Sequence, residues 1–461
     1  MIFRTARLLS VFITFIPLQL PAQVKEALSV AVNVLENDPQ FNHASISLYV
    51  VNANTGKVVF QKNSKLGVAP ASCQKIITSA SAFELLGSNY QYKTVFKLDK
   101  AIDTTVLLID GTGDPTIGSW RWETTTMDAV LQKLRAALAS NKLSAVRVVL
   151  SNNKFPHQPV PDGWVWEDIG NYYGAGAWAF NWHENQYDLL LASGKAEGDS
   201  THIIGFDPSS AEMPLSNFIT TGKKGSGDNA YIYAAPYSNT GFATGTIPPG
   251  QERFKISGSI PEPSSVFIKA LSKVLGQNGV AVVDKDQHTT ISLNTSSFKT
   301  ICTITSPTFD SMNYWFLKKS INLYGEAFVK TIGSERGSIA STDTGISIIR
   351  DFWEKKGIER SAINIIDGSG LSPANRITTN ALVKVLQFAK QQPWFSSFQN
   401  ALPEINGIKM KDGYIGGVRS YAGYVTSLKG EQFIFSFIIN NYDGDPGIVR
   451  QKMWRILDIL K

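Results

Sequence analysis

The segment PASCQK (residues 70–75) opens an apolar run that ends at Gly87. A proline suits the first turn of a helix and a glycine suits the residue just past its end, so we expect a largely buried helix here. Ser72 and Lys75 stand three residues apart and therefore share one face of that helix. A serine at a helix N-terminus with an amine one turn away predicts a nucleophile that gives its proton to lysine. This chemistry requires burial or a nearby cation to lower the pKa of Lys75.

Two further S-x-x-K strings occur, Ser151/Lys154 and Ser296/Lys299. Neither begins a long apolar helix, so neither has the helix dipole and the burial that a lysine base requires. Sequence context therefore selects Ser72, with a plain buried helix start as the alternative.

The N-terminal residues 1–22 are predicted to be a signal peptide. Arg4 and Arg7 precede an apolar core from Leu8 to Leu20, and small residues follow at the exit. That core is shorter than the roughly 20 residues needed to cross a bilayer, and no later stretch is long enough. We therefore expect a periplasmic protein whose mature chain has no membrane span, with a retained N-terminal anchor as the alternative.

Composition excludes several classes of function. The formal net charge is +6 and falls to +4 when Arg4 and Arg7 are removed, which argues against a nucleic-acid partner. The five histidines and two cysteines show no metal-ligand spacing, and no glycine-rich phosphate loop follows a strand, so neither metal nor cofactor is expected. Cys73 and Cys302 do not form a disulfide framework.

The chain is long enough for two or three domains. A hairpin at residues 45–63 has too few strands for an independent sheet, so we expect it to join antiparallel strands near residues 408–440. This arrangement predicts an α+β fold with a discontinuous domain formed by residues 23–96 and 263–461. Residues 97–262 form an insert of α/β and β-rich character, expected to hold two small domains, the inner one at about 155–240. The aromatic residues between 155 and 185 are expected to be core or interface in that insert, and less often a ligand platform.

Three short motifs carry the predicted chemistry: Ser72-x-x-Lys75, Ser320-x-Asn322 and Lys411-x-Gly413. Ser320 can relay a proton to a leaving amine, and the Asn322 amide can bond both the lysine and a substrate backbone. Lys411 would help to keep Lys75 neutral and attract an anionic substrate, while Gly413 would allow a close approach of strand and ligand.

This trio is the signature of β-lactamases and penicillin-binding proteins. The chain resembles the penicillin-binding protein 4-like D-alanyl-D-alanine carboxypeptidases/endopeptidases of peptidase family S13. Besides the trio, the motifs that carry the resemblance are GDPT (113–116), WED (166–168), YGA (173–175), SINLYGEA (320–327), DGSGLS (367–372) and GVRSYAGYV (417–425).

The resemblance implies a transpeptidase-type domain, an antiparallel sheet covered by helices, that cleaves peptidoglycan stem peptides. Ser72 would attack the D-Ala carbonyl to form an acyl-enzyme, and β-lactams would acylate the same serine. Backbone N–H groups of Ser72 and of Tyr414, just after Gly413, would form the oxyanion hole. The resemblance implies no cofactor and leaves the oligomeric state open.

Asp412 departs from the family pattern, which has Thr or Ser at this position to bind the terminal carboxylate of the substrate. An ionised Asp412 would repel that carboxylate and offset part of the charge of Lys411. Three interpretations remain: Asp412 points away, it shifts the preference toward endopeptidase action, or the protein is a weak enzyme that binds peptidoglycan. A β-lactamase-like hydrolase is disfavoured by the long insert that places Ser320 248 positions after Ser72.

Overall fold

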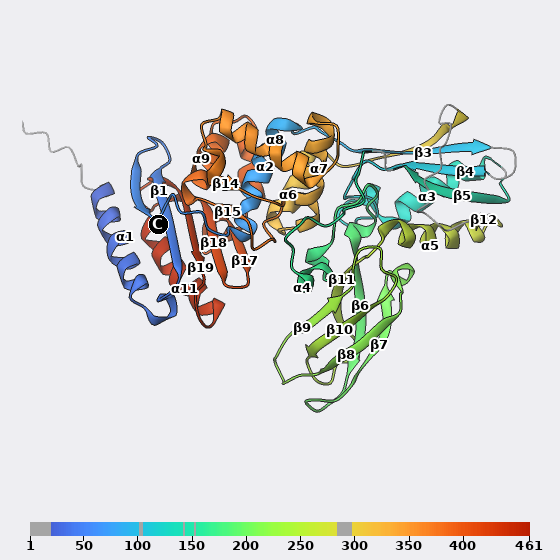
Figure 1. Ribbon diagram of the computed structural model, residues 1–461, viewed down its shortest axis with the longest axis horizontal. Coiled ribbons are helices and arrows are strands. Elements are labelled where there is room, and N and C mark those ends of the chain that lie inside the picture. Colours follow the sequence, from blue (N-terminus) through green and yellow to red (C-terminus); the bar gives the residue numbers. More distant parts are fainter. Residues whose placement is uncertain (1–19, 101–104, 142, 152–153, 284–296) are drawn as a thin grey trace, which may run out of the picture.

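The computed structural model describes residues 20–100, 105–141, 143–151, 154–283 and 297–461. Most of the predicted signal peptide lies outside these ranges. The described chain is elongated, with a mixed sheet-and-helix body at one end and the inserted region at the other (Figure 1). None of the helices in the described ranges combines the length and the apolar character needed to cross a membrane.

The first body is built on a six-stranded antiparallel sheet with the strand order β16-β17-β18-β19-β1-β2. β1 pairs with β19 along its whole length, which confirms that the N-terminal hairpin joins the C-terminal strands. The strands are β1 (Ser45–Asn52), β2 (Val58–Lys62), β16 (Glu404–Ile405), β17 (Ile408–Ile415), β18 (Val418–Thr426) and β19 (Gln432–Asn440).

Helices cover both faces of this sheet (Figure 1). In β19, Phe435 packs toward α1 and α11 on one face, while Ile434 and Ile438 pack toward α2 and α9 on the other. This accounts for a strand that is apolar on both sides. The helices of this body are α1 (Leu20–Glu36), α2 (Lys75–Leu85), α6 (Phe309–Lys318), α7 (Asn322–Arg336), α8 (Thr342–Lys355), α9 (Thr379–Lys390), α10 (Phe395–Ala401) and α11 (Pro446–Leu457), and a small β14–β15 ladder (Ile363–Asn364, Arg376–Ile377) lies beside them.

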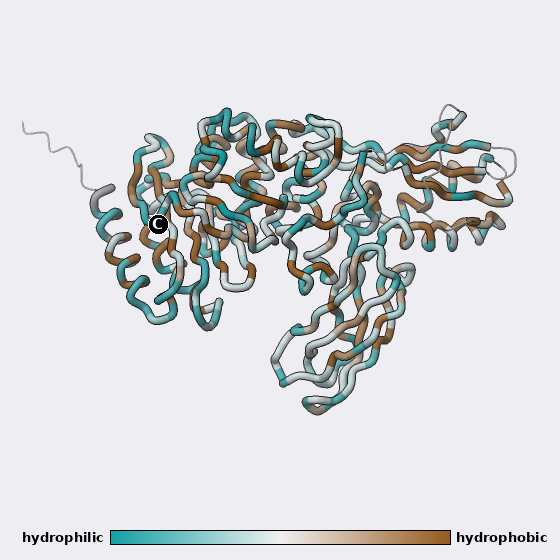
Figure 2. Tube along the Cα trace, in the orientation of Figure 1, coloured by the Kyte–Doolittle hydropathy of each residue, from teal (hydrophilic) through white to brown (hydrophobic). Residues whose placement is uncertain are grey.

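The insert begins with a five-stranded sheet of order β12-β5-β4-β3-β13. α3 (Met127–Ala139) and α5 (Pro263–Gly276) lie along one face of it (Figure 1). Hydrophobic residues run along the central strands of this sheet (Figure 2). Along α1 of the first body, by contrast, hydrophobic and polar residues alternate (Figure 2). The strands of the five-stranded sheet are β3 (Lys93–Lys100), β4 (Thr105–Asp110), β5 (Ala145–Ser151), β12 (Ala281–Val283) and β13 (Lys299–Thr305).

The predicted domain boundary at 96/97 falls within β3, and the one at 262/263 separates β12 and β13 from the rest of this sheet. β13 pairs with β3, and β12 pairs with β5, so both strands belong to the insert although they follow residue 263. Hydrophobic periodicity predicts the type of an element but not its pairing partner, so the sequence could not assign β12 and β13 to this sheet. We propose that the insert runs from Lys93 to Thr305.

Two three-stranded sheets, β11-β6-β7 and β8-β10-β9, form the rest of the insert. Buried residues of both sheets, such as Ile219 and Ile256, share one apolar cluster with Leu107 of the five-stranded sheet. The strands reach Ser259, beyond the predicted inner boundary at about 240. They are β6 (Gln186–Ser193), β7 (Thr201–Asp207), β8 (Leu215–Thr221), β9 (Asn229–Tyr233), β10 (Gly241–Ile247) and β11 (Phe254–Ser259), and the short α4 (Trp166–Ile169) lies near β9.

Candidate active site

Ser72 lies in a 3-10 turn, Ala71–Gln74, immediately before α2. The α-helix therefore starts at Lys75 and not at Pro70 as the sequence predicts. Ala71 has a φ of 44°, in the left-handed region that a residue with a side chain rarely adopts, so a regular helix cannot pass through it. The Ser420 hydroxyl donates to the Pro70 carbonyl (2.6 Å) and helps to hold this strained turn against the sheet.

Lys75 is fully buried beside the serine. Its Nζ lies 3.0 Å from Ser72 Oγ and donates to Asn322 Oδ1 (2.6 Å) and to the Ser369 carbonyl (2.8 Å). A neutral amine has two N–H donors and one lone pair. With the two donors directed at Asn322 and Ser369, the lone pair faces the Ser72 hydroxyl, which is the geometry required of a general base.

The surroundings of Lys75 favour its neutral form. Burial lowers the pKa of Lys75 to about 7, and the positive charge of Lys411 acts in the same direction. The carboxyl groups of Asp367, Glu326 and Asp412 oppose this shift. The condition that the sequence set for a lysine base is therefore met by desolvation first and by a neighbouring cation second.

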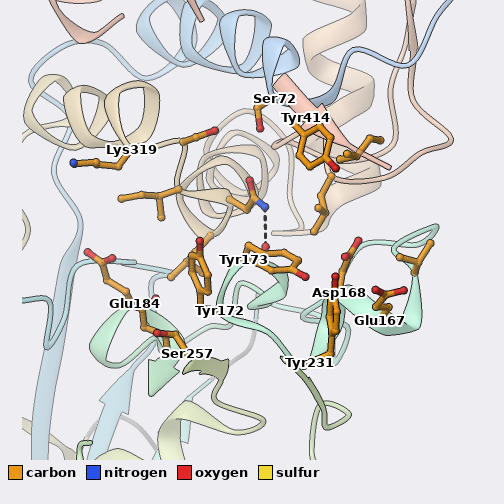
Figure 3. A pocket seen from close by; sticks show the side chains of 18 of the residues that line it. Ser72, Glu167, Asp168, Tyr172, Tyr173, Glu184, Tyr231, Ser257, Lys319 and Tyr414 are labelled. Carbon is orange, nitrogen blue, oxygen red and sulfur yellow. Dashed lines mark hydrogen bonds between the residues drawn. The ribbon is translucent and has the colours of Figure 1, made fainter. Parts of the chain in front are cut away.

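The second motif stands at the start of α7. Ser320 precedes the helix with a φ of 57° and lines the same cavity as Ser72. Asn322 is the first residue of α7, and its Nδ2 donates to the Tyr173 carbonyl (2.7 Å; Figure 3). One amide side chain thus joins the lysine base to the insert.

β17 forms another wall of the site. A Cβ atom at Gly413 would lie 2.7 Å from the Ser72 nitrogen, so only glycine allows the strand to approach the nucleophile this closely. Tyr414 lines the cavity with a half-exposed ring. The ladder with β16 involves only Ile408 and Lys409. The Met410 N–H donates to the Pro403 carbonyl, and the Lys411 carbonyl accepts from Cys73 Sγ. Beyond them, residues 412–415 pair with no strand on this side in the described part of the chain.

Lys411 and Asp412 bind each other at this edge. Lys411 Nζ donates to Asp412 Oδ1 (2.8 Å) and to the Asp412 carbonyl (2.7 Å). Burial disfavours the charged form of Asp412, but the charge and hydrogen bond of Lys411, a backbone hydrogen bond and the charge of Arg419 together outweigh it, so the pKa of Asp412 is lowered. Neither residue lines the cavity that holds Ser72. The ammonium of Lys411 is therefore directed at Asp412 and not into the cavity.

Two buried carboxyl groups support the site from behind. Asp367 accepts from Gln74 Nε2, Trp164 Nε1 and Asn375 Nδ2, and from two backbone N–H groups of its own loop. Glu326 accepts from the backbone N–H of Ser369, whose carbonyl holds Lys75. Burial raises the pKa of Glu326 to about 8, with a further contribution from Asp367. The motifs that contain these residues were visible in the sequence, but their role was not, because it depends on tertiary contacts.

The insert supplies the opposite wall of the cavity, which has a volume of about 1000 Å³ (Figure 3). Burial raises the pKa of Asp168 to about 6, and Glu167 contributes. The predicted role of the aromatic cluster is correct in part: Trp182 and Phe180 are core, whereas Tyr172 and Tyr173 line the cavity. The lining residues from the insert are Arg121, Val165, Glu167, Asp168, Tyr172, Tyr173, Glu184, Gln186, Tyr231 and Ser257.

Within the described ranges, His, Cys, Asp and Glu side chains form no group of three or more that could hold a metal ion. Cys73 and Cys302 are both free and buried. Burial raises the pKa of the Cys73 thiol to about 12, so this neighbour of Ser72 is not a reactive thiolate.

The sequence is similar to those of known carboxypeptidases. Residues 28–409 match the model of the D-Ala-D-Ala carboxypeptidase 3 (S13) family. The D-alanyl-D-alanine carboxypeptidase of Actinomadura sp. (strain R39) is 25% identical over 453 residues, which cover 91% of this chain and 82% of the relative. The penicillin-sensitive carboxypeptidase A of Dictyostelium discoideum is 23% identical over 364 residues, covering 71% and 65%.

The same fold occurs in a solved structure, penicillin binding protein 4 from Haemophilus influenzae. It superposes with a TM-score of 0.76 at 17% sequence identity, over 94% of this chain and 97% of that one. The fold predicted from the motifs, a penicillin-binding-protein sheet covered by helices with a large insert, is thereby confirmed. The family match spans most of the sequence and includes the turn of Ser72 and the start of β17. The chain therefore belongs to the D-Ala-D-Ala carboxypeptidase 3 (S13) family of hydrolases.

Proposed function

We propose that this protein cleaves D-Ala-containing bonds of peptidoglycan stem peptides through an acyl-enzyme on Ser72. The observation that carries the proposal is the buried Lys75 amine. Its nitrogen lies 3.0 Å from Ser72 Oγ, and it donates hydrogen bonds to the oxygens of Asn322 and Ser369. The family to which the chain belongs, and the names of its carboxypeptidase relatives, support this substrate class.

In the first step Ser72 Oγ attacks the carbonyl carbon of a D-Ala residue while Lys75 takes the hydroxyl proton. The oxyanion would be bound by the N–H groups of Ser72 and Tyr414, which the glycine at 413 allows to lie close together. Ser320, in the same cavity, would pass the proton held by Lys75 to the leaving amine nitrogen as the C–N bond breaks, which leaves Lys75 neutral again. Water then attacks the ester, Lys75 accepts the water proton and returns it to Ser72 Oγ, and the acid product leaves.

The Lys411–Asp412 pair bears on the balance between release of terminal D-Ala and cleavage of cross-links. A carboxypeptidase substrate ends in a free carboxylate, which would meet a lysine whose charge is already offset by Asp412. A cross-link can present a different group at this point. We therefore propose that cross-link cleavage is favoured over release of terminal D-Ala. The alternative, a catalytically weak protein that binds peptidoglycan, is supported by the same ion pair.

Incubation with penicillin followed by intact-mass spectrometry tests the proposal. The parent protein should gain the mass of one penicillin, and Ser72→Ala should gain none, while both remain folded by circular dichroism. The name of the Dictyostelium relative, a penicillin-sensitive carboxypeptidase, supports this expectation. A folded parent without an adduct, or an adduct on Ser72→Ala, would contradict the proposal. Rapid turnover of the penicillin would instead indicate a β-lactamase-like hydrolase.

We also propose a periplasmic location, because residues 1–22 have the pattern of a signal peptide. Cell fractionation with N-terminal sequencing of the mature protein tests this. A protein that retains Met1 or remains in the cytoplasmic fraction would contradict it.

A further inference from the structure

The outer face of the β8-β10-β9 sheet carries exposed aromatic rings. The inward residues of these strands, Ile219, Ile232 and Ala243, are almost fully buried in the core of the insert. On the outward side, Phe218 of β8 is 64% exposed and Phe242 of β10 is 37% exposed. Rings of this size on a solvent-facing sheet have no role in the core, and they indicate a contact surface.

These rings form a continuous row that we call the aromatic ladder. Phe218 contacts Phe242, with ring centroids 6.4 Å apart, and Phe242 stacks on Tyr233 at 4.8 Å with an angle of 10° between the ring planes. Tyr233 in turn contacts Trp166 of α4 at 5.9 Å. The ladder, Phe218, Phe242, Tyr233 and Trp166, therefore crosses all three strands and reaches the helix beside the cavity (Figure 1).

The ladder is continuous with the candidate active site. Val165 and Glu167, the two neighbours of Trp166, both line the cavity of Ser72. Tyr231 stands two residues before Tyr233 in β9, on the same face of the strand, and it also lines the cavity (Figure 3). A ligand on the ladder can therefore extend into the cavity without leaving this surface.

The chemistry of this face selects one kind of ligand. β8, β9 and β10 contain no charged residue, and the outward polar residues are hydroxyl and amide groups: Ser216, Thr220, Asn229, Thr244 and Thr246. Nucleic acids and anionic membranes require clustered Lys or Arg, which these strands lack. Aromatic rings beside neutral hydrogen-bonding groups suit a sugar, which presents C–H groups on the faces of its ring and hydroxyl or acetamido groups around the rim.

We propose that the aromatic ladder binds the glycan strand of peptidoglycan while a stem peptide of the same strand occupies the cavity of Ser72. This inference rests on the proposed function, because it is the stem peptide that joins a glycan to the site. Stacking of sugar rings on the ladder would raise the affinity for polymeric peptidoglycan over that for a free peptide.

The test compares binding with catalysis. Phe218→Ala/Phe242→Ala is made in the parent and in Ser72→Ala, with Ile204→Ala, an exposed apolar residue of β7 outside the ladder, as the matched control. Co-sedimentation with intact peptidoglycan, and with glycan strands freed of peptides, measures binding of the Ser72→Ala forms. The double variant should bind both materials about tenfold more weakly, since two stacking contacts with the sugar are lost. The control should bind as before.

In the active background, penicillin acylation and hydrolysis of a free pentapeptide should be unchanged by the double variant, because neither ring lines the cavity. Equal binding of the double variant and Ser72→Ala to peptide-free glycan would overturn the inference. Loss of binding only to lipid vesicles, or of self-association, would overturn it too. A parent that is never acylated by penicillin would instead overturn the proposed function. If the double variant unfolds, Phe218→Ala alone, at the most exposed ring, replaces it in the test. Its binding to the glycan should be about threefold weaker.

Discussion

The Lys75 amine has to titrate near neutral pH if it is the base that activates Ser72. Burial lowers the pKa of Lys75 to about 7. Only the unprotonated amine can accept the Ser72 proton, so the rate of penicillin acylation should rise with pH and level off above about 7. Stopped-time mass spectrometry of the adduct between pH 5 and 9 measures this. A rate that falls across this range would exclude lysine as the base.

Lys411 should contribute to that low pKa from its position on β17. Lys411→Met removes the cation and leaves Asp412 as an unpaired negative charge, and both changes raise the pKa of Lys75. We expect acylation at pH 7 to fall by about tenfold and the pH profile to move to higher pH. Lys409→Met, on the same strand but outside the site, is the control. An unchanged profile would mean that Asp412 already cancels the effect of Lys411.

Asp412 stands where the resemblance to the family implies Thr or Ser. Asp412→Thr releases Lys411 and removes a charge that repels a terminal carboxylate. We expect D-Ala release from a pentapeptide to increase by about tenfold, within the few kcal/mol that a partly solvated charge contact can contribute, with cross-link cleavage changed less. Asp412→Asn separates the loss of charge from the gain of a hydroxyl. Equal product profiles for the parent and Asp412→Thr would exclude the interpretation that Asp412 shifts the preference toward endopeptidase action.

At the scale of elements, the loop after β14 fixes the rear of the site. Asp367 is fully buried and accepts from side chains of the turn that holds Ser72, the insert and its own loop. Asp367→Ala leaves these donors without an acceptor, so we expect a loss of about 3 kcal/mol in the free energy of unfolding, measured with urea. Acylation should fall as well, because the loop carries the Ser369 carbonyl that holds Lys75.

Asp351→Ala is the control for this variant. Asp351 pairs with Arg360 on the surface, with about half of its side chain exposed, and its loss should cost no more than about 1 kcal/mol. A similar cost for Asp367→Ala would show that the loop is held by its backbone alone.

Particular elements illustrate what the sequence could and could not predict. Local signals predicted β1, β2 and α2, and the sheet then followed because a lone hairpin has too few strands. The left-handed Ala71 was not predictable, since nothing local favours it over a regular helical turn. The pairing of β13 with β3 depends on contacts between residues distant in sequence, and the direction of the Lys411 side chain depends on its rotation toward Asp412. Motif spacing and hydrophobic periodicity predict neither of these features.

At the scale of the whole molecule, the insert and the sheet body build the cavity jointly. Ser72, Ser320 and Tyr414 come from the body, whereas Asp168 and Tyr173 come from the insert. The two parts are also joined by Lys330 of α7, whose buried Nζ donates to the carbonyls of Gln158, Pro159 and Ala177. Burial lowers the pKa of Lys330 to about 8. This lysine therefore holds residues 158–177, which include cavity-lining residues of the insert, against α7.

Lys330→Met tests whether that attachment controls the site. Methionine fills a similar volume but leaves the carbonyls of Gln158 and Ala177 without the lysine donor, while the Pro159 carbonyl keeps the Ala177 N–H. We therefore expect a loss of about 3 kcal/mol in stability and faster hydrogen exchange between residues 154 and 183. Since Asn322 is bound by the Tyr173 carbonyl in this segment, acylation of Ser72 should slow too. Lys269→Met, an exposed lysine that donates to the single carbonyl of Glu212, is the matched control. Unchanged exchange in Lys330→Met would show that the insert holds its position by apolar packing alone, and the cavity wall would then not depend on this lysine.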